Sequence, residues 1–218
     1  MTTSYTCVLL DLDGTLIDSA PGITATLAWT FEQLGEPIPS PSALLKYVGP
    51  PLLQSFETIG GMSEAEAHQA LAVYRERYLA HGVTNVSAYD GIAETLAAVK
   101  ASGLPSSLAT SKPESLARLA LTHLGLMDSI DVMTGASEDE TRSEKKDVVA
   151  LALQRLAAFG ADLSNPVMVG DRFYDVEGAA ANGVPTIYVD WGYGSPAEQV
   201  GAVAVVSTPA ELQSLLLP

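Results

Sequence analysis

The stretch VLLDLDGTLIDS, residues 8–19, decides how this sequence is interpreted. Three apolar residues lead into Asp11 and Asp13, and Gly14 follows at once. A short apolar run of this kind is typical of a buried strand, so two carboxylates stand at the end of that strand. Buried carboxylates are costly unless a cation or hydrogen-bond donors compensate their charge. The sequence therefore predicts that compensating groups from elsewhere in the chain gather at this strand end.

Composition limits the classes of protein to which the chain belongs. Its 218 residues, 47% of them hydrophobic, suffice for one domain with a sizeable core and a modest second domain. With 11 basic and 26 acidic residues, the net charge of −15 disfavours a nucleic-acid partner. A small anionic substrate would have to meet a local cluster of positive charge, because the field of the whole molecule opposes its approach.

The sequence also predicts where the protein works. No apolar run reaches the roughly 18 to 20 residues of a membrane span, and the N-terminus lacks the pattern of a signal peptide. The single Cys7 lies in the first apolar run, where a buried, inert thiol is expected. We therefore expect a cytoplasmic protein with no membrane partner.

Short apolar runs alternate with helical patterns along most of the chain. The helical patterns carry apolar residues at three-and-four spacing and end at glycine, a common helix stop. The runs expected to be strands are 7–11, 104–110, 130–135, 166–171, 185–190 and 202–207, and the helical patterns between them are 90–103, 112–125 and 145–160. This alternation predicts an α/β fold, a Rossmann-like doubly wound parallel sheet with helices on both faces.

One region interrupts the alternation. Between about residues 21 and 87 there is no convincing strand, and the segments 23–35, 42–61 and 63–82 have helical patterns. We expect an inserted, all-helical cap domain at 18–87, and a catalytic core formed by 1–17 and 88–218. The alternative is a long helical crossover with no special role.

Polar and charged residues follow several of the predicted strands. In an open parallel sheet, ligands bind at the carboxyl ends of the strands, so these residues are expected to meet at one edge. They are Asp11, Asp13, Thr110, Ser111, Lys112, Asp171 and Asp175, with Lys145 and Lys146 at the start of a helix. Clustered carboxylates without histidine or cysteine favour a hard cation, Mg²⁺ rather than zinc.

These residue types suit metal-assisted phosphoryl transfer. A carboxylate can attack phosphorus and form an acyl phosphate, and a second carboxyl can move the proton. A lysine and a hydroxyl neutralise and bind the transferred group. Backbone N–H groups through Leu12, Asp13 and Gly14 are expected to cradle its oxygens, with Gly14 permitting the turn.

Four segments then resemble, in order, the motifs of a known family. DLDGTLIDS, ATSKPE, SEKKDVVALAL and VGDRFYDVEGA are similar to the four motifs of the haloacid dehalogenase superfamily. VGPPLLQSF, YRERYLAHG, YDGIAETLAAVKASG and DWGYGSPAEQ extend the resemblance to its phosphoglycolate phosphatase and 5′-nucleotidase-like branch, which has a small helical cap. The resemblance covers nearly the whole chain and implies a Mg²⁺-dependent phosphatase acting on a small phosphate monoester.

The resemblance also implies catalytic roles. Asp11 matches the family's nucleophile and Asp13 its general acid/base, while Thr110 matches the hydroxyl of the second motif. Lys145 best matches the lysine of the third motif, with Lys146 as the second choice.

A metal site is implied in the same way. Asp11, the backbone carbonyl of Asp13, Asp171 and Asp175 match the metal ligands, and Asp175 is expected to bind either directly or through water. We expect the Asp13 carboxyl itself to point away from the metal. The alternative is a purely structural role for Asp175, as an acid in the first turn of a helix, where the helix dipole favours a negative charge.

Four polar residues keep open roles. Ser111 and Lys112 either contact phosphate or belong to a helix start beside Pro113. Arg75 and Arg77 are interpreted as a helix face that is solvated or paired with Glu76 and its neighbours, rather than as substrate ligands.

The resemblance leaves alternatives for the function. Both phosphoglycolate and nucleoside monophosphates fit the branch as substrates. A sugar-phosphate mutase similar to β-phosphoglucomutase is the nearest rival, although the segment after residue 18 lacks the histidine typical of such mutases. A non-catalytic phosphate-binding module and a signalling receiver domain are less favoured. We expect either a monomer or a homodimer.

Overall fold

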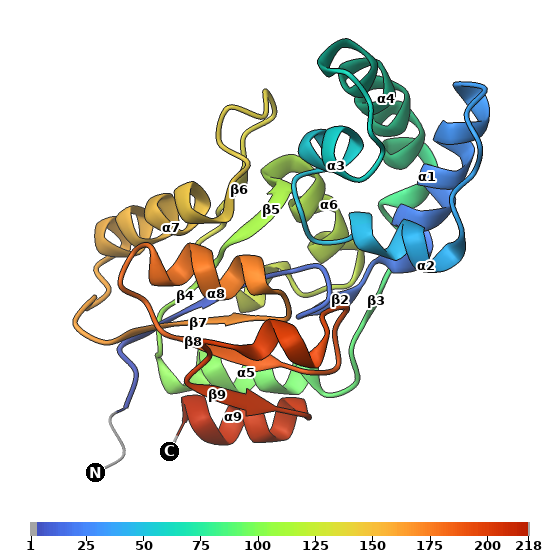
Figure 1. Cartoon of the computed structure of the whole chain (residues 1–218). Coiled ribbons are helices and arrows are strands. Elements are labelled where there is room, and N and C mark those ends of the chain that lie inside the picture. The colour runs from blue at the N-terminus through green and yellow to red at the C-terminus, as the bar shows by residue number, and fades with distance from the viewer. Residues whose placement is uncertain (1–3, 218) are drawn as a thin grey trace.

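The computed structural model describes residues 4–217, and Figure 1 shows its elements. Residues 1–3 and 218 of the predicted catalytic core lie outside this described part.

A five-stranded parallel sheet forms the centre of the molecule, in the order β4-β1-β7-β8-β9. The strands are β1 (Cys7–Leu10), β4 (Ser106–Leu108), β7 (Pro166–Gly170), β8 (Thr186–Val189) and β9 (Ala204–Val206). The chain leaves β1 for β4 on one side and then crosses to β7 on the other. The sheet therefore has a topological switch point beside β1, which is where open α/β sheets bind ligands.

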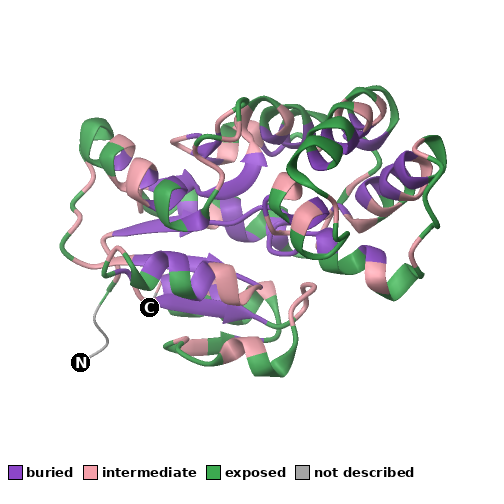
Figure 2. Cartoon of the chain, turned by 45° about the horizontal axis from the view of Figure 1, so that its top comes forward, coloured by how far each residue is buried: buried purple, intermediate pink, exposed green. Residues whose placement is uncertain are grey.

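Helices cover both faces of this sheet, which confirms the predicted α/β class (Figures 1 and 2). Four of them flank the strands: α5 (Ile92–Ser102), α7 (Lys145–Phe159), α8 (Phe173–Ala180) and α9 (Pro209–Leu216). Alternate residues of β1 serve opposite faces, because successive side chains of a strand point to opposite sides. Cys7 and Leu9 belong to the apolar cluster that contains α7, whereas Val8 and Leu10 belong to the cluster that contains α5 and α9.

Cys7 has the inert role expected of it. Its side chain is fully buried in β1, and burial raises the pKa of the thiol to about 11.

The predicted strand at 130–135 is the main departure within the core. It contributes only a bridge between Val132 and Ser107, followed by a two-residue strand β6 (Gly135–Ala136) that pairs with β5 (Thr110–Pro113). The register of this pair shifts between Thr110 and Pro113. Pro113 lacks an N–H group and cannot continue a ladder of backbone hydrogen bonds, which keeps the pairing short. Helix α6 (Glu114–His123) begins directly afterwards.

Residues 20–82 form a group of helices beside the carboxyl end of β1, and we call this segment the helical insertion (Figure 1). Its elements are α1 (Ala20–Gln33), α2 (Pro41–Leu44), the 3₁₀ turn Leu45–Tyr47, α3 (Leu52–Thr58), α4 (Glu64–Arg77) and a π turn at Tyr78–Gly82. The helical pattern expected over 42–61 is broken at residues 48–51. Gly49 has a positive φ of 103°, and Pro50 and Pro51 follow it, so the backbone cannot stay helical there.

A small ladder that the sequence did not predict joins the two ends of the helical insertion. Strands β2 (Ile17–Asp18) and β3 (Ser87–Ala88) pair antiparallel, with Ile17 opposite Ala88 and Asp18 opposite Ser87. The expected boundaries at 17/18 and 87/88 therefore fall inside this ladder. Within residues 4–217, no helix combines the length and the apolar character needed to cross a membrane.

Candidate active site

Three carboxylates meet at the switch point, two from the ends of neighbouring strands and one from a helix. Asp11 follows β1 and Asp171 follows β7, and these strands pair with Leu10 opposite Val169. Asp175 lies one turn further on, at the start of α8. Oxygens of Asp11, Asp171 and Asp175 lie within 4.8 Å of one another, and all three residues are buried.

Lys145 is the cation that reaches this cluster. As the first residue of α7, it places Nζ 2.7 Å from Asp11 Oδ1, 2.7 Å from Asp175 Oδ1 and 3.0 Å from the carbonyl oxygen of Ala109. Lys146 is exposed and pairs instead with Glu144. Of the two lysines that the sequence left open, the structure brings only Lys145 to Asp11.

One ammonium group does not compensate three buried acids. Burial raises the pKa of Asp11 to about 7, although Lys145 lowers it. Burial and the neighbouring carboxylates raise the pKa of Asp171 well above its ordinary range. Asp175 Oδ1 is buried and, despite its ion pair with Lys145, has no partner in hydrogen-bond geometry within the described residues. An all-oxygen donor set with an unsatisfied carboxylate oxygen fits a hard cation such as Mg²⁺.

Asp171 is held from two sides. Its Oδ1 accepts the hydroxyl of Thr15 at 3.2 Å, and its Oδ2 accepts the backbone N–H of Tyr193 at 2.7 Å. Gly14, with φ of 88°, passes so close that a Cβ there would overlap Asp171 Oδ2 and the Tyr193 ring. Neither Thr15 nor Tyr193 was predicted as a site residue, because neither follows a predicted strand directly.

Asp13 faces away from the three clustered acids. Lys112 Nζ donates to both of its carboxylate oxygens, at 3.1 and 3.0 Å, and this ammonium lies 4.9 Å from the centroid of the Tyr78 ring. The sequence had left the role of Lys112 open. Its position two residues after Thr110, at the same strand end, is the signal that pointed toward the site.

The turn after β1 offers fewer amides than the sequence predicted. The N–H of Gly14 donates to the carbonyl of Ile17 at 2.9 Å, because the turn closes on itself. For the N–H groups of Leu12 and Asp13, no backbone acceptor is found within residues 4–217. Thr110 is buried beside this turn and accepts the N–H of Lys112 at 3.2 Å.

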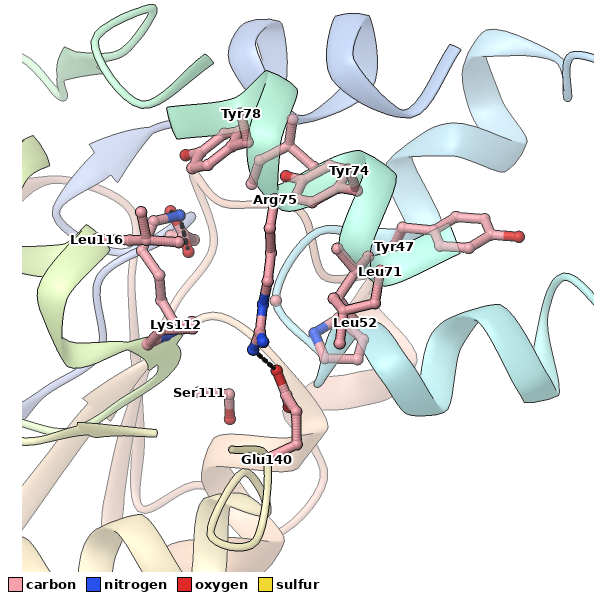
Figure 3. Close-up of a pocket in the computed structure, with 15 residues that line it drawn as sticks. Tyr47, Leu52, Leu71, Tyr74, Arg75, Tyr78, Ser111, Lys112, Leu116 and Glu140 are labelled. Carbon is pink, nitrogen blue, oxygen red and sulfur yellow. Dashed lines mark hydrogen bonds and ion pairs between the residues drawn. The ribbon is translucent and has the colours of Figure 1, made fainter. Parts of the chain in front are cut away.

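A small cavity of about 60 Å³ lies between the core, where Asp13 lines it, and the helical insertion. Figure 3 shows this cavity with its labelled lining residues from both parts. The core contributes Asp13, Ser111, Lys112, Pro113, Leu116 and Glu140 to its lining, and the insertion contributes Ile23, Tyr47, Gly49, Pro50, Leu52, Leu71, Tyr74, Arg75 and Tyr78. The turn at Gly49 and Pro50 thus reaches the site.

The two arginines of α4 behave differently. Arg75 pairs with Glu140 inside the cavity (Figure 3), which corrects the interpretation of this residue as part of a solvated face. Arg77 stacks over the ring of Trp29, 5.1 Å from the ring centroid, and does not line the cavity. Residues two apart on a helix point in different directions, but the sequence does not show which direction faces the core, so both arginines received the same interpretation.

Comparison with known proteins agrees with this geometry. The family described as "Haloacid dehalogenase-like hydrolase" matches residues 8–189, and the chain belongs to this family. A solved structure described as a predicted phosphatase from Clostridium acetobutylicum superposes with a TM-score of 0.92. It is 36% identical, and the match covers 99% of each chain.

Curated relatives carry different names. The tyrosine-protein kinase PtkA of Mycobacterium tuberculosis is 42% identical over 86% of this chain, which spans only 62% of that relative's length. A 5′-nucleotidase of Pseudomonas aeruginosa is 37% identical, and the match covers 89% of this chain and 86% of the relative. A phosphoglycolate phosphatase of Thiobacillus denitrificans is 31% identical, with 94% and 92% covered.

Proposed function

We propose that this chain is a Mg²⁺-dependent phosphatase that hydrolyses a small phosphate monoester through an aspartyl phosphate on Asp11. The observation that carries the proposal is the convergence of Asp11, Asp171, Asp175 and Lys145 at one strand end, with Asp13 turned toward a separate cavity. The relatives named as phosphatases and a nucleotidase support the reaction class.

In this proposal the chain's own residues divide the chemistry. Asp11 attacks phosphorus, because it contacts Lys145 and directly follows β1, next to the turn that carries the N–H groups of Leu12 and Asp13. Lys145, Thr110 and the N–H groups of Leu12 and Asp13 bind the transferred oxygens. Ser111, on the cavity wall, adds a hydroxyl.

Asp13 is assigned the proton transfers. Its carboxyl faces the cavity where the leaving group would lie, so it donates a proton to the leaving oxygen and then accepts one from the attacking water. The proposed metal ligands are Asp11, Asp171, Asp175 and the carbonyl of Asp13. When bound, Mg²⁺ would neutralise the acidic cluster and the charge of the phosphoryl group.

The helical insertion would serve as the cap predicted at 18–87. It supplies most of the cavity lining, so it would exclude water from the phosphoryl group and select the leaving group. The names of the relatives favour phosphoglycolate or a nucleoside monophosphate as substrate. A cytoplasmic location and a monomeric or homodimeric state remain predictions from the sequence.

A second candidate comes from the mycobacterial relative named as a tyrosine-protein kinase. A tyrosine hydroxyl would then take the place of water in accepting the phosphoryl group. The small volume of the cavity between the insertion and the core favours a small ester over a protein segment. The sugar-phosphate mutase and the non-catalytic binding module stay less favoured alternatives. Analysis of the products distinguishes the phosphatase, the tyrosine kinase and the mutase, because their products are free phosphate, phosphotyrosine and an isomeric sugar phosphate.

Phosphate release with and without Mg²⁺ tests the leading proposal. We expect EDTA to abolish turnover, and Asp11→Asn to lower kcat by roughly a thousandfold or more, because an amide cannot replace the nucleophile. The control is Asp128→Asn, an exposed acid remote from the cluster, which should keep full activity. Turnover that survives in Asp11→Asn would rule out an aspartyl phosphate on this residue.

A further inference from the structure

We propose that Arg75 is the specificity-determining residue of this site and that it binds a carboxylate carried by the leaving group of the substrate. This inference rests on the proposed phosphatase function, because the cavity that holds Arg75 lies on the side of Asp13 where a leaving group would be bound.

Arg75 extends from α4 into the cavity between the insertion and the core (Figure 3). Its side chain is 33% exposed, so it is neither sealed in the core nor freely solvated. The other basic side chain of the lining, Lys112, already donates to both oxygens of Asp13. Arg75 is therefore the lining cation that the catalytic groups leave available to a ligand. A guanidinium presents parallel N–H donors that match a carboxylate.

Glu140 shows what kind of group the Arg75 guanidinium binds. It comes from the segment between β6 and α7, far along the chain, and its carboxylate contacts Arg75 inside the cavity. Its backbone has a φ of 63°, a left-handed conformation that is unfavourable for a residue with a side chain. Burial also raises the pKa of the Glu140 carboxyl, even though Arg75 opposes that shift. The guanidinium of Arg75 thus already binds a carboxylate at this place in the cavity, and a substrate carboxylate would compete with Glu140 for the same donors.

The size of the cavity sets the scale of the leaving group. About 60 Å³ holds only a few water molecules. A hydroxy acid of two or three carbons is of this scale, whereas a nucleoside would extend beyond the cavity toward solvent. The wall from Tyr74, Leu71 and Leu52 is largely apolar, which strengthens a buried ion pair at its end. The net charge of −15 repels anions at long range, so binding of an acid depends on this local cation.

A matched pair of esters isolates the carboxylate. Phosphoglycolate and 2-hydroxyethyl phosphate have nearly the same size and differ in one carboxylate replaced by a hydroxymethyl group. We expect Arg75→Gln to lower the ratio of their kcat/KM values at least tenfold, mainly through the KM of phosphoglycolate. Arg77→Gln is the control, because Arg77 lies two residues away, contacts Trp29 and does not line the cavity, so the ratio should not change.

Glu140→Gln gives a change of the opposite sign. Removing the internal carboxylate leaves Arg75 unneutralised, so the KM of phosphoglycolate should fall relative to that of 2-hydroxyethyl phosphate. If Arg75 and Glu140 only fasten the insertion to the core, both variants will change the two esters by equal factors, and that outcome overturns the inference.

A binding measurement distinguishes a failure of this inference from a failure of the proposed function. In the Asp11→Asn background, calorimetry should show phosphoglycolate binding that weakens at least tenfold when Arg75→Gln is added. Such binding without any hydrolysis by the native protein would refute the phosphatase proposal and keep the carboxylate site. Hydrolysis of both esters with no preference for phosphoglycolate would refute the carboxylate site alone.

Discussion

Asp171 illustrates how little freedom the individual residues of the site have. Each of its oxygens accepts one hydrogen bond, from Thr15 and from the Tyr193 amide, and the Gly14 backbone passes close to Oδ2. The position of this carboxylate is therefore set by three segments of the chain at once. In the proposed metal site, such support would hold Asp171 in place before Mg²⁺ binds.

Gly14→Ala should damage the site more than the fold. The new methyl group would overlap the Asp171 carboxylate, and the positive φ of 88° adds backbone strain of about 1–2 kcal/mol. We expect a loss of at least about tenfold in kcat, since a displacement of about 1 Å is enough for such losses. Phosphate release and urea unfolding measure the two effects.

Gly35→Ala is the matched control for that substitution. Gly35 also has a positive φ, of 73°, but a Cβ there would meet nothing within 4 Å. It should lose a similar amount of stability and keep its activity. Equal activity in the two variants would show that the contact with Asp171 has no catalytic importance.

The site residues that could be predicted from the sequence are those that directly follow a strand. Asp11, Asp13 and Asp171 stand at strand ends, where topology alone brings them together. The pairing of Lys112 with Asp13 spans 99 residues, and that of Arg75 with Glu140 spans 65. Such contacts depend on the placement of whole elements, which no local pattern in the sequence specifies.

At the scale of elements, the segment after β8 connects the acidic cluster to the helical insertion. The Nε1 of Trp191 donates to the carbonyl of Thr15 at 3.1 Å, and the amide of Tyr193 donates to Asp171. The hydroxyl of Tyr193 donates to Asp18 at 2.8 Å and accepts the N–H groups of Ser19 and Ala20, at the start of α1. One residue therefore contacts both a proposed metal ligand and the first turn of the insertion.

Tyr193→Phe should separate these two connections. The backbone bond to Asp171 stays, whereas the N–H of Ser19 loses its acceptor and the N–H of Ala20 keeps only Asp18 Oδ1, which costs about 1–3 kcal/mol. We expect lower stability in urea unfolding and a severalfold rise in KM, with Mg²⁺ affinity unchanged in calorimetry. Tyr174→Phe is the control, because its hydroxyl makes no hydrogen bond within the described residues and its stability should not change. A Tyr193→Phe variant as stable as the native protein would contradict this assignment.

The elements that sequence patterns missed are the short ones. β2 and β3 have two residues each, too few for the alternation that reveals a strand, and they form only because the insertion returns beside its starting point. The 130–135 run was predicted as a strand from its apolar residues, yet Pro113 on the neighbouring segment limits its pairing. Long helices such as α7 carry enough turns for their periodicity to be read, and they were predicted nearly to the residue.

At the scale of the whole molecule, one apolar cluster runs through both parts of the chain. It contains Leu10 and Val169 from the sheet together with Leu27, Phe56 and Tyr78 from the helical insertion. Because apolar burial drives folding, parts that share a cluster gain stability from each other. We therefore expect the insertion and the core to unfold together.

The two tryptophans make this expectation measurable. Trp29 lies in α1 of the insertion and Trp191 in the core, so Trp191→Phe and Trp29→Phe each leave a reporter in one part. In urea, the fluorescence and far-UV circular dichroism transitions should coincide in both variants, as two-state unfolding requires. If Trp29 fluorescence changes at lower urea than the circular dichroism, the insertion unfolds by itself.

The ladder between β2 and β3 has a consequence for how such a protein changes over generations. Because Ile17 lies opposite Ala88, the whole insertion begins and ends at one point of the core. A single in-frame exchange of the gene segment for residues 19–86 would therefore replace the entire insertion and leave the order of the sheet strands intact. The new segment need only present an equivalent apolar face. In the proposed assignment, the core residues that transfer the phosphoryl group and the insertion residues that select the leaving group can thus be inherited separately. A lineage can then acquire a new substrate while it keeps the same reaction.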